Sequence, residues 1–272
     1  MSISPRELVS GTIEIASLPE IFLKVNEMID SPRHSAADIG RVISHDTAFS
    51  ARLLKIANSV FYGFPSQIDT ISRAITVIGT RELRDLILAT SVMRVFKGLP
   101  NDLVTMEDFW RHSICCGLAA RSLAAQRGEQ LVERFFVAGL LHDIGVVPIL
   151  MYADQYPSLA QDAKQLEKTI KELKPELGSV ILKRWGFNEE MVATATHSEN
   201  WRYHHEGEAD FADLVIVAHL HHMMLDEERM KKLSKVPAFR RLFPGESDPS
   251  VLNTIMAQAR SQLEDTRQLL VA

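Results

Sequence analysis

A histidine and an aspartate stand side by side in an otherwise apolar run, FFVAGLLHDIGVVPILM, at residues 135–151. This setting predicts that His142 and Asp143 are buried, and a buried carboxylate without a partner is very costly. Asp143 therefore needs a cation, a set of hydrogen-bond donors or a metal ion. Three further histidines lie inside apolar helical segments and are candidates to complete such a site: His112, His197 and His219.

These residue types support two interpretations. Imidazole and carboxylate groups are suitable ligands for zinc, iron, manganese or nickel. The same groups would also form a buried polar network without an ion, in which Asp143 accepts hydrogen bonds from the histidines. The residues alone leave both interpretations open, and no catalytic residue is assigned.

The elements that carry these residues are predicted to be helices. Apolar residues repeat at helical rather than alternating spacing, and the sequence contains no convincing strand pair or hairpin signal, so the predicted fold class is all-α. Helix starts are marked by Ser35 with Asp38, by Thr105 with Asp108, and by Asp248 before a proline. From residue 105 onward we expect helices at about 105–126, 130–143, 157–172, 175–185, 188–197, 209–226 and from 248.

The chain is predicted to form two packed helical lobes. A cluster of helix breakers at residues 97–105 separates them. We expect a tail at 1–14, an N-terminal helical lobe at 15–100, and a second helical lobe at 101–272 that includes the C-terminal helix.

Composition excludes several classes of protein. The 272 residues are 46% hydrophobic and 24% charged with a net charge of −5, which is typical of a soluble globular protein and shows no general nucleic-acid footprint. The neighbouring Cys115 and Cys116 are expected to be buried thiols in a reducing compartment. No apolar run is expected to span a membrane and no export signal is recognised, so a cytoplasmic location is predicted.

Several motifs resemble a known family. The segments LPEIFLKVNEMI, VISHDTAFSARLLKIANSVFYG, ISRAITVIGTRELRDLIL and GLLHDIG, within about residues 15–225, are similar to the HDOD domain. This is the HD-related output domain of bacterial signalling proteins, in the superfamily of HD metal-dependent phosphohydrolases. The resemblance implies that the second lobe is an HD-type helical bundle. It also implies that a motif in ANSVFYGF organises the lobe interface: Asn58, Ser59, Tyr62 and Gly63.

The chain departs from the family's metal-binding pattern. Where relatives close to active enzymes carry a histidine in H-x-x-x-G, the sequence reads KPELGSVILKRWG, and we assign Pro175 to that position. A common His-His doublet is reduced to His197 followed by Ser198, and His219 stands for the late aspartate. Since proline cannot bind a metal through its side chain and serine is a poor replacement for imidazole, a two-metal centre is not expected.

One divalent metal ion remains compatible with the pattern, with His197 nearby or in a second layer. Three imidazoles and one carboxylate would favour zinc, iron or nickel over magnesium. The metal-free polar network stays the alternative. The predicted metal ligands are His112, His142, Asp143 and His219.

The resemblance implies a bacterial signal-transduction protein that acts mainly as a non-catalytic binding and relay module with a protein partner. A second hypothesis is a mononuclear metal-dependent phosphohydrolase that acts on a nucleotide or another phosphoester. A third is a sensor that binds a nucleotide second messenger without cleaving it.

Overall fold

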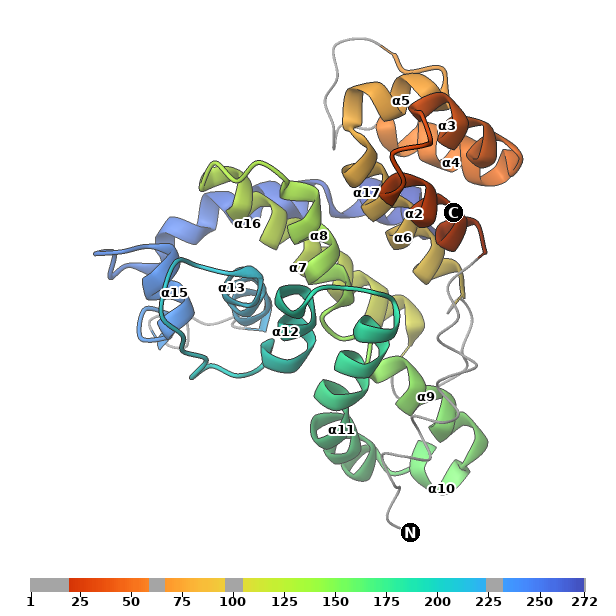
Figure 1. Cartoon of the computed structure of the whole chain (residues 1–272). Helices are drawn as coiled ribbons and strands as arrows, with labels where there is room; N and C mark the ends of the chain where they lie inside the picture. Colours follow the sequence, from red (N-terminus) through yellow and green to blue (C-terminus); the bar gives the residue numbers. More distant parts are fainter. Residues whose placement is uncertain (1–19, 59–66, 96–104, 224–231, 272) are drawn as a thin grey trace. The chain divides into compact units, whose positions relative to one another are not determined.

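The computed structural model describes residues 20–58, 67–95, 105–223 and 232–271, and every regular element in these ranges is a helix (Figure 1). This confirms the all-α class. The helices form two compact units. We call Leu18–Lys97 with Ser261–Ala272 the N-terminal unit, and Gly98–Arg260 the central unit.

The N-terminal unit buries the apolar faces of short amphipathic helices. Ser35 caps the second of these helices through the predicted capping box, in which Ser35 N–H donates to Asp38 Oδ2 at 2.8 Å. Buried residues such as Val25, Ile43 and Leu83 form its core. Its helices are α2 (Glu20–Asp30), α3 (Ala36–Ser44), α4 (Thr47–Ala57), α5 (Ile71–Ile78), α6 (Thr80–Val95) and α17 (Leu263–Val271).

The C-terminal helix differs from the expected division. Asp248 caps the predicted start, but the segment is split into a 3-10 turn η1 (Pro249–Val251), α16 (Leu252–Ser261) and α17. Helix α17 packs against α4 and α6, so the end of the chain clusters with the N-terminal unit rather than with residues 101–260. An amphipathic helix needs an apolar partner surface, and its sequence does not specify which unit provides it.

The central unit is built around α13, which is buried on all sides. Its residues Leu214, Val215 and Ile216 are fully buried, as expected of a helix that is apolar around its circumference. It packs against α7, α8, α12 and α15. The helices of this unit, besides η1 and α16, are α7 (Met106–Gln126), α8 (Val132–Leu141), α9 (Val146–Gln155), α10 (Pro157–Ala160), α11 (Ala163–Arg184), α12 (Glu189–His197), α13 (Phe211–Met223) and α15 (Pro237–Leu242).

Helices α7 and α8 cross at two glycines. A Cβ atom on Gly139 would lie 2.6 Å from the carbonyl oxygen of Cys116, and one on Gly117 would lie 2.7 Å from that of Phe136. Such distances are below van der Waals contact, so the absence of side chains at both positions lets the two backbones approach. This crossing brings the histidine of α7 close to the end of α8.

Two sequence expectations are corrected in this unit. Val132–Gln155 is long and apolar enough to cross a membrane, but 89% of its apolar window is buried inside the protein. Residues 142–145 also interrupt it as a turn between α8 and α9, so its apolar character belongs to the core. The expected break at Pro175 is wrong, since α11 continues through it. Proline removes one backbone hydrogen bond, and burial of Leu166 before it and Leu177 after it holds the helix on both sides.

Candidate metal centre

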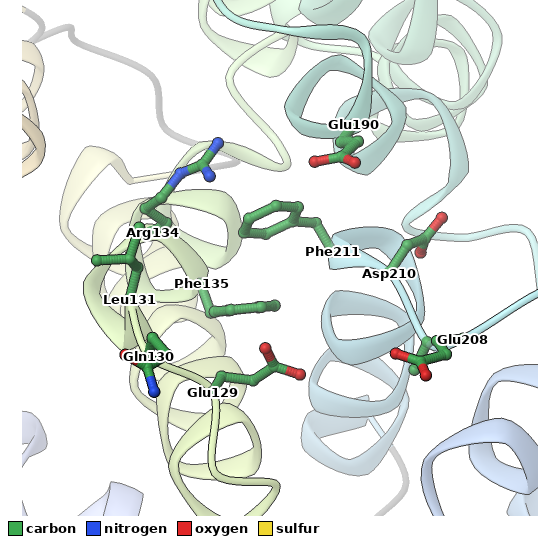
Figure 2. Close-up of a pocket in the computed structure, with 10 residues that line it drawn as sticks. Glu129, Gln130, Leu131, Arg134, Phe135, Glu190, Glu208, Asp210 and Phe211 are labelled. Carbon is green, nitrogen blue, oxygen red and sulfur yellow. The ribbon is translucent and has the colours of Figure 1, made fainter. Parts of the chain in front are cut away.

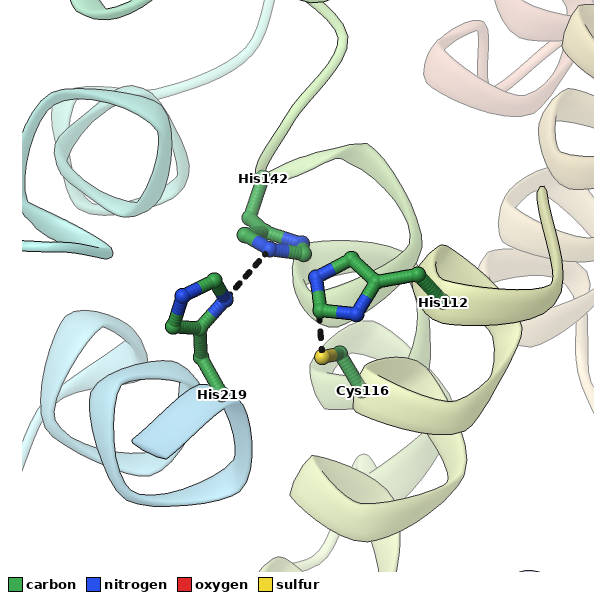
Figure 3. A group of neighbouring side chains, drawn as sticks. All are labelled: His112, Cys116, His142 and His219. Atoms are coloured by element: carbon green, nitrogen blue, oxygen red, sulfur yellow. Dashed lines mark hydrogen bonds between the residues drawn. The ribbon is translucent and has the colours of Figure 1, made fainter. Parts of the chain in front are cut away.

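Three elements of the central unit bring the candidate ligands together (Figure 3). Helix α7 carries His112 and Cys116 one turn apart, the turn after α8 carries His142, and α13 carries His219. One ligand atom from each of these four residues lies within 4.8 Å of the others. Residues separated by more than 100 positions in sequence therefore meet in one buried group, which we call the His/Cys group.

Backbone contacts orient the ring of His142. Its Nδ1 lies 2.7 Å from the carbonyl oxygen of Gly139, and since a carbonyl only accepts, Nδ1–H is the donor. The other nitrogen, Nε2, faces the group and lies 3.2 Å from His219 Nδ1. A metal-binding histidine commonly donates its second ring nitrogen to a carbonyl in this way.

Asp143 lies at the edge of the same group. Its Oδ2 is 3.3 Å from His142 Nε2 and 3.6 Å from His112 Nε2. Its side chain is 11% exposed, in agreement with the burial that the apolar run indicated. The structure thus gathers all four residues that the sequence singled out as ligands, and their binding of an ion stays a prediction.

Cys116 is a member that the sequence analysis missed. Its Sγ lies 3.7 Å from His112 Nε2, and the residue is fully buried. Burial raises the pKa of this thiol well above its usual value, with the neighbouring Cys115 as a second cause. The signal was the spacing of four residues between His112 and Cys116, which places both on one face of a helix.

Burial keeps His112 and His219 neutral. Desolvation, followed by repulsion from His142, lowers the pKa of His112 to about 2 and that of His219 to about 3. His222, whose ring centroid lies 4.8 Å from that of His112, also has a lowered pKa, mainly through burial. Neutral imidazoles keep their lone pairs, so the group is prepared to bind a metal ion near neutral pH.

This electrostatic arrangement predicts acid sensitivity of the metal-free protein. Below pH 6.5 the unfolded chain protonates His112 and His219 while the folded chain does not, so the free energy of unfolding falls as pH falls. The loss would reach about 1.4 kcal/mol per pH unit for each histidine. Urea unfolding in EDTA at several pH values between about 7 and 5 measures it. A smaller slope is expected for His219→Gln, and an equal slope in both proteins would contradict the assignment.

Lys174 is the second residue that the sequence analysis missed. Its Nζ donates to Asp143 Oδ1 at 2.7 Å and to Glu199 Oε1 at 2.6 Å, and its side chain is only 3% exposed. Burial alone would lower the pKa of Lys174, but the two carboxylates outweigh it and raise that pKa. In return, His142 and Lys174 hold the pKa of Asp143 well below its usual value against the opposing effect of burial. The buried carboxylate therefore has a resident cation.

Lys174 also changes the comparison with the H-x-x-x-G pattern. Counting back from Gly178 places Lys174, rather than Pro175, in the position of the histidine. The structure agrees with this register because Lys174, and not Pro175, contacts Asp143. The sequence assignment of Pro175 was therefore displaced by one residue.

The other predicted residues lie elsewhere or act indirectly. His197 stacks on Tyr203 with ring centroids 4.5 Å apart, and Ser198 is buried.

Asn58 ends α4 and exchanges hydrogen bonds with the backbone of Ile68, from Ile68 N–H to Asn58 Oδ1 at 2.7 Å and from Asn58 Nδ2 to Ile68 O at 2.6 Å. Its role at the lobe interface stays a prediction. The rest of that motif lies outside the described residues: Ser59, Tyr62 and Gly63.

A second cluster of titratable residues lies between α12 and α15. His205 Nε2 is 2.9 Å from Asp213 Oδ2, and Arg241 Nη1 donates to Asp213 Oδ1 at 2.6 Å. Tyr203 donates its hydroxyl to Asp210 at 2.7 Å. These carboxylates are already paired with a guanidinium, an imidazole and a phenol. The cluster therefore has a structural role, in which it holds the loop before α13 against α13 and α15.

A pocket of about 440 Å³ opens beside the start of α13 (Figure 2). Phe135 and Phe211 stack at its centre with ring centroids 4.3 Å apart, and Arg134 lies 5.0 Å from the ring of Phe211. The lining carries four carboxylates and one guanidinium, so it is acidic and unfavourable to a phosphate group. They are Glu129, Glu190, Glu208 and Asp210.

The described residues form an all-helical protein with a buried adjacent His–Asp pair, His142 and Asp143, in its core. The model of the HDOD domain family matches residues 15–201. The match covers well over half of the sequence, and the chain therefore belongs to the HDOD domain family.

Other proteins are similar to this chain in sequence or in fold. An uncharacterised protein from Treponema pallidum (strain Nichols) is 25% identical over 94% of this chain, which spans about half (49%) of that relative. A crystal structure of an HDOD domain protein with unknown function from Geobacter sulfurreducens has a TM-score of 0.73 at 21% identity, and covers 98% of both chains. A provisionally assigned metal-dependent phosphohydrolase from Shewanella amazonensis SB2B has a TM-score of 0.73 at 22% identity, over 94% of this chain and 99% of its own. At these identities the two structures show a common fold.

Proposed function

We propose that this chain acts in bacterial signal transduction as a binding and relay module, and that it does not hydrolyse phosphoesters. The observation that carries the proposal is the contact of Lys174 Nζ with Asp143 Oδ1 at 2.7 Å. Two-metal hydrolysis needs ligands for two ions that together hold the attacking and leaving oxygens. With one carboxylate oxygen committed to an ammonium, Asp143 has only Oδ2 left for an ion.

The residues present fit one metal ion. Three imidazoles, with either Asp143 Oδ2 or Cys116 Sγ as a fourth ligand, form a set that suits zinc, iron or nickel. When bound, such an ion would supply Lewis acidity at the site. The chain's own residues hold α7, the turn after α8, and α13 together around it, so binding of an ion would stiffen the connection among these three elements.

The buried group also supports a relay that does not depend on an ion. The hydrogen bond between His142 and His219 connects the turn after α8 to α13, and the pairing of Asp143 with Lys174 connects the same turn to α11. Glu199, the other partner of Lys174, has a side chain that is 46% exposed, so the network runs from the core to the surface. A protein partner that contacts this surface would sense the state of the buried site, which is the relay that we propose.

The second hypothesis is a mononuclear phosphohydrolase. The His/Cys group, with Asp143 at its edge, and the provisional assignment of the Shewanella protein favour it. The pocket beside the start of α13 contains none of the predicted metal ligands, and its acidic lining disfavours a phosphoester or a nucleotide, so it supports neither this hypothesis nor that of a nucleotide sensor. We therefore place binding and relay first.

Metal content and turnover test the proposal together. The full chain would be purified without a metal-affinity column, and its zinc, iron and nickel would be measured by mass spectrometry beside Asp143→Ala and His142→Ala. We expect about one ion per chain or none. We expect no hydrolysis of bis(p-nitrophenyl) phosphate or of cyclic dinucleotides after addition of Mn²⁺, Fe²⁺ or Ni²⁺.

Hydrolysis that depends on a metal and disappears in Asp143→Ala would overturn the proposal and establish the phosphohydrolase. The relay itself predicts a partner that co-purifies with the full chain from its own cells and that Glu199→Ala weakens. A surface variant, Glu172→Ala, provides the control because its carboxylate is 62% exposed and pairs only loosely with Lys168 at 3.8 Å.

A further inference from the structure

Lys174 bridges Asp143, at the edge of the candidate metal centre, to a second carboxylate, that of Glu199. The Lys174 ammonium contacts one oxygen of each carboxylate, at 2.7 Å and 2.6 Å. It approaches Asp143 through Oδ1, whereas Oδ2 faces the histidines. Asp143 is therefore positioned between two cation positions, one at the His/Cys group and one at Lys174.

Charge explains why the second position needs a cation. Two carboxylates that converge on one point repel each other, and burial of Asp143 increases the cost because little water screens the repulsion. A single ammonium offsets half of this charge. A divalent ion would offset all of it, and carboxylate oxygens are the ligands that Mn²⁺ and Mg²⁺ prefer.

We infer that the side chain of Lys174 occupies a second cation position and keeps a divalent metal out of it. Replacing the lysine with a neutral residue would open a metal site between Asp143 and Glu199. This inference rests on the proposed function, because it gives the reason why the chain holds one ion at most. The ligand class of the opened site is a hard divalent cation.

Manganese binding by Lys174→Gln tests the inference. The wild type, Lys174→Gln and the double variant Lys174→Gln/Glu199→Gln would be dialysed against MnCl₂, and manganese per chain would be measured by mass spectrometry. We expect Lys174→Gln to bind about one more ion per chain than the wild type, and the double variant to lose this excess. Manganese should also raise the melting temperature of Lys174→Gln more than that of the wild type.

A matched control lies on the same helix. Lys168 is 65% exposed and pairs with Glu172, so Lys168→Gln should bind the same amount of manganese as the wild type. Should Lys174→Gln fail to fold in chelator, Lys174→His would replace it, since a protonated imidazole can pair with both carboxylates until a metal displaces its proton. Equal manganese content and equal melting shifts in the wild type and the folded variant would overturn the inference.

The outcomes separate this inference from the proposed function. If Lys174→Gln binds no excess manganese and the wild type shows no turnover, Lys174 does not exclude a metal and the inference fails. The proposed relay function is unaffected by that result. Turnover by the wild type with excess manganese in the variant would overturn the relay and support Lys174. Two ions bound by the wild type would overturn both.

Discussion

Asp143→Ala is expected to lower the free energy of unfolding by about 3–5 kcal/mol, because the change leaves a buried ammonium with one of its two carboxylates removed. Lys174 is 3% exposed and cannot turn into water without opening the contact between α11 and the turn after α8. The remaining partner, Glu199, lies near the surface and compensates only in part.

Urea unfolding of metal-free protein measures this effect. Removal of both the Asp143 carboxylate and the Lys174 ammonium should recover part of the lost free energy of unfolding. Asp143→Ala/Lys174→Met is therefore expected to be more stable than Asp143→Ala alone. Glu172→Ala, which breaks an exposed pair on the same helix, should change stability by less than about 1 kcal/mol. A similarly small effect of Asp143→Ala would show that the bridge is not a buried ion pair in solution.

Gly145→Ala is expected to destabilise the central unit by about 3 kcal/mol or more, because it overpacks a backbone contact. Gly145 has φ −65° and ψ −13°, a conformation that alanine adopts easily. The space around it is the obstacle. A Cβ atom would lie 2.1 Å from the carbonyl oxygen of Lys174 and 2.6 Å from the backbone nitrogen of Gly178.

The same change should disturb the candidate site. Backbone atoms cannot rotate away as a side chain can, so α11 must shift and carry the Lys174 ammonium away from Asp143. We expect the pairing energy between Asp143 and Lys174, measured by a double-mutant cycle, to fall in the Gly145→Ala background. Gly40→Ala in α3 is the control, because its new Cβ would approach closely only the Ser72 hydroxyl, at 2.9 Å, with the next atom, the Ser72 backbone nitrogen, at an ordinary 3.6 Å. Equal stability of the Gly145→Ala and Gly40→Ala variants would contradict the close approach of α11.

Local patterns in the sequence determined much of this protein. Helical spacing of apolar residues predicted the all-α class, and the capping box at Ser35 and the cap at Asp248 appear where they were expected. The apolar run around His142 and Asp143 predicted their burial, and the same motifs indicated the HDOD family. These predictions hold because each depends on neighbours within one or two helical turns.

The tertiary structure alone decided which residues complete the site. Lys174 lies 31 positions from Asp143, and no periodicity relates an ammonium on α11 to a carboxylate in a turn. Gly145 reads in the sequence as the end of a helix, whereas the structure assigns it to the close approach of α11. The C-terminal helix likewise found its partner surface in the N-terminal unit. In each case the physical cause is a contact between backbones or charges distant in sequence, which exists only once the helices have packed.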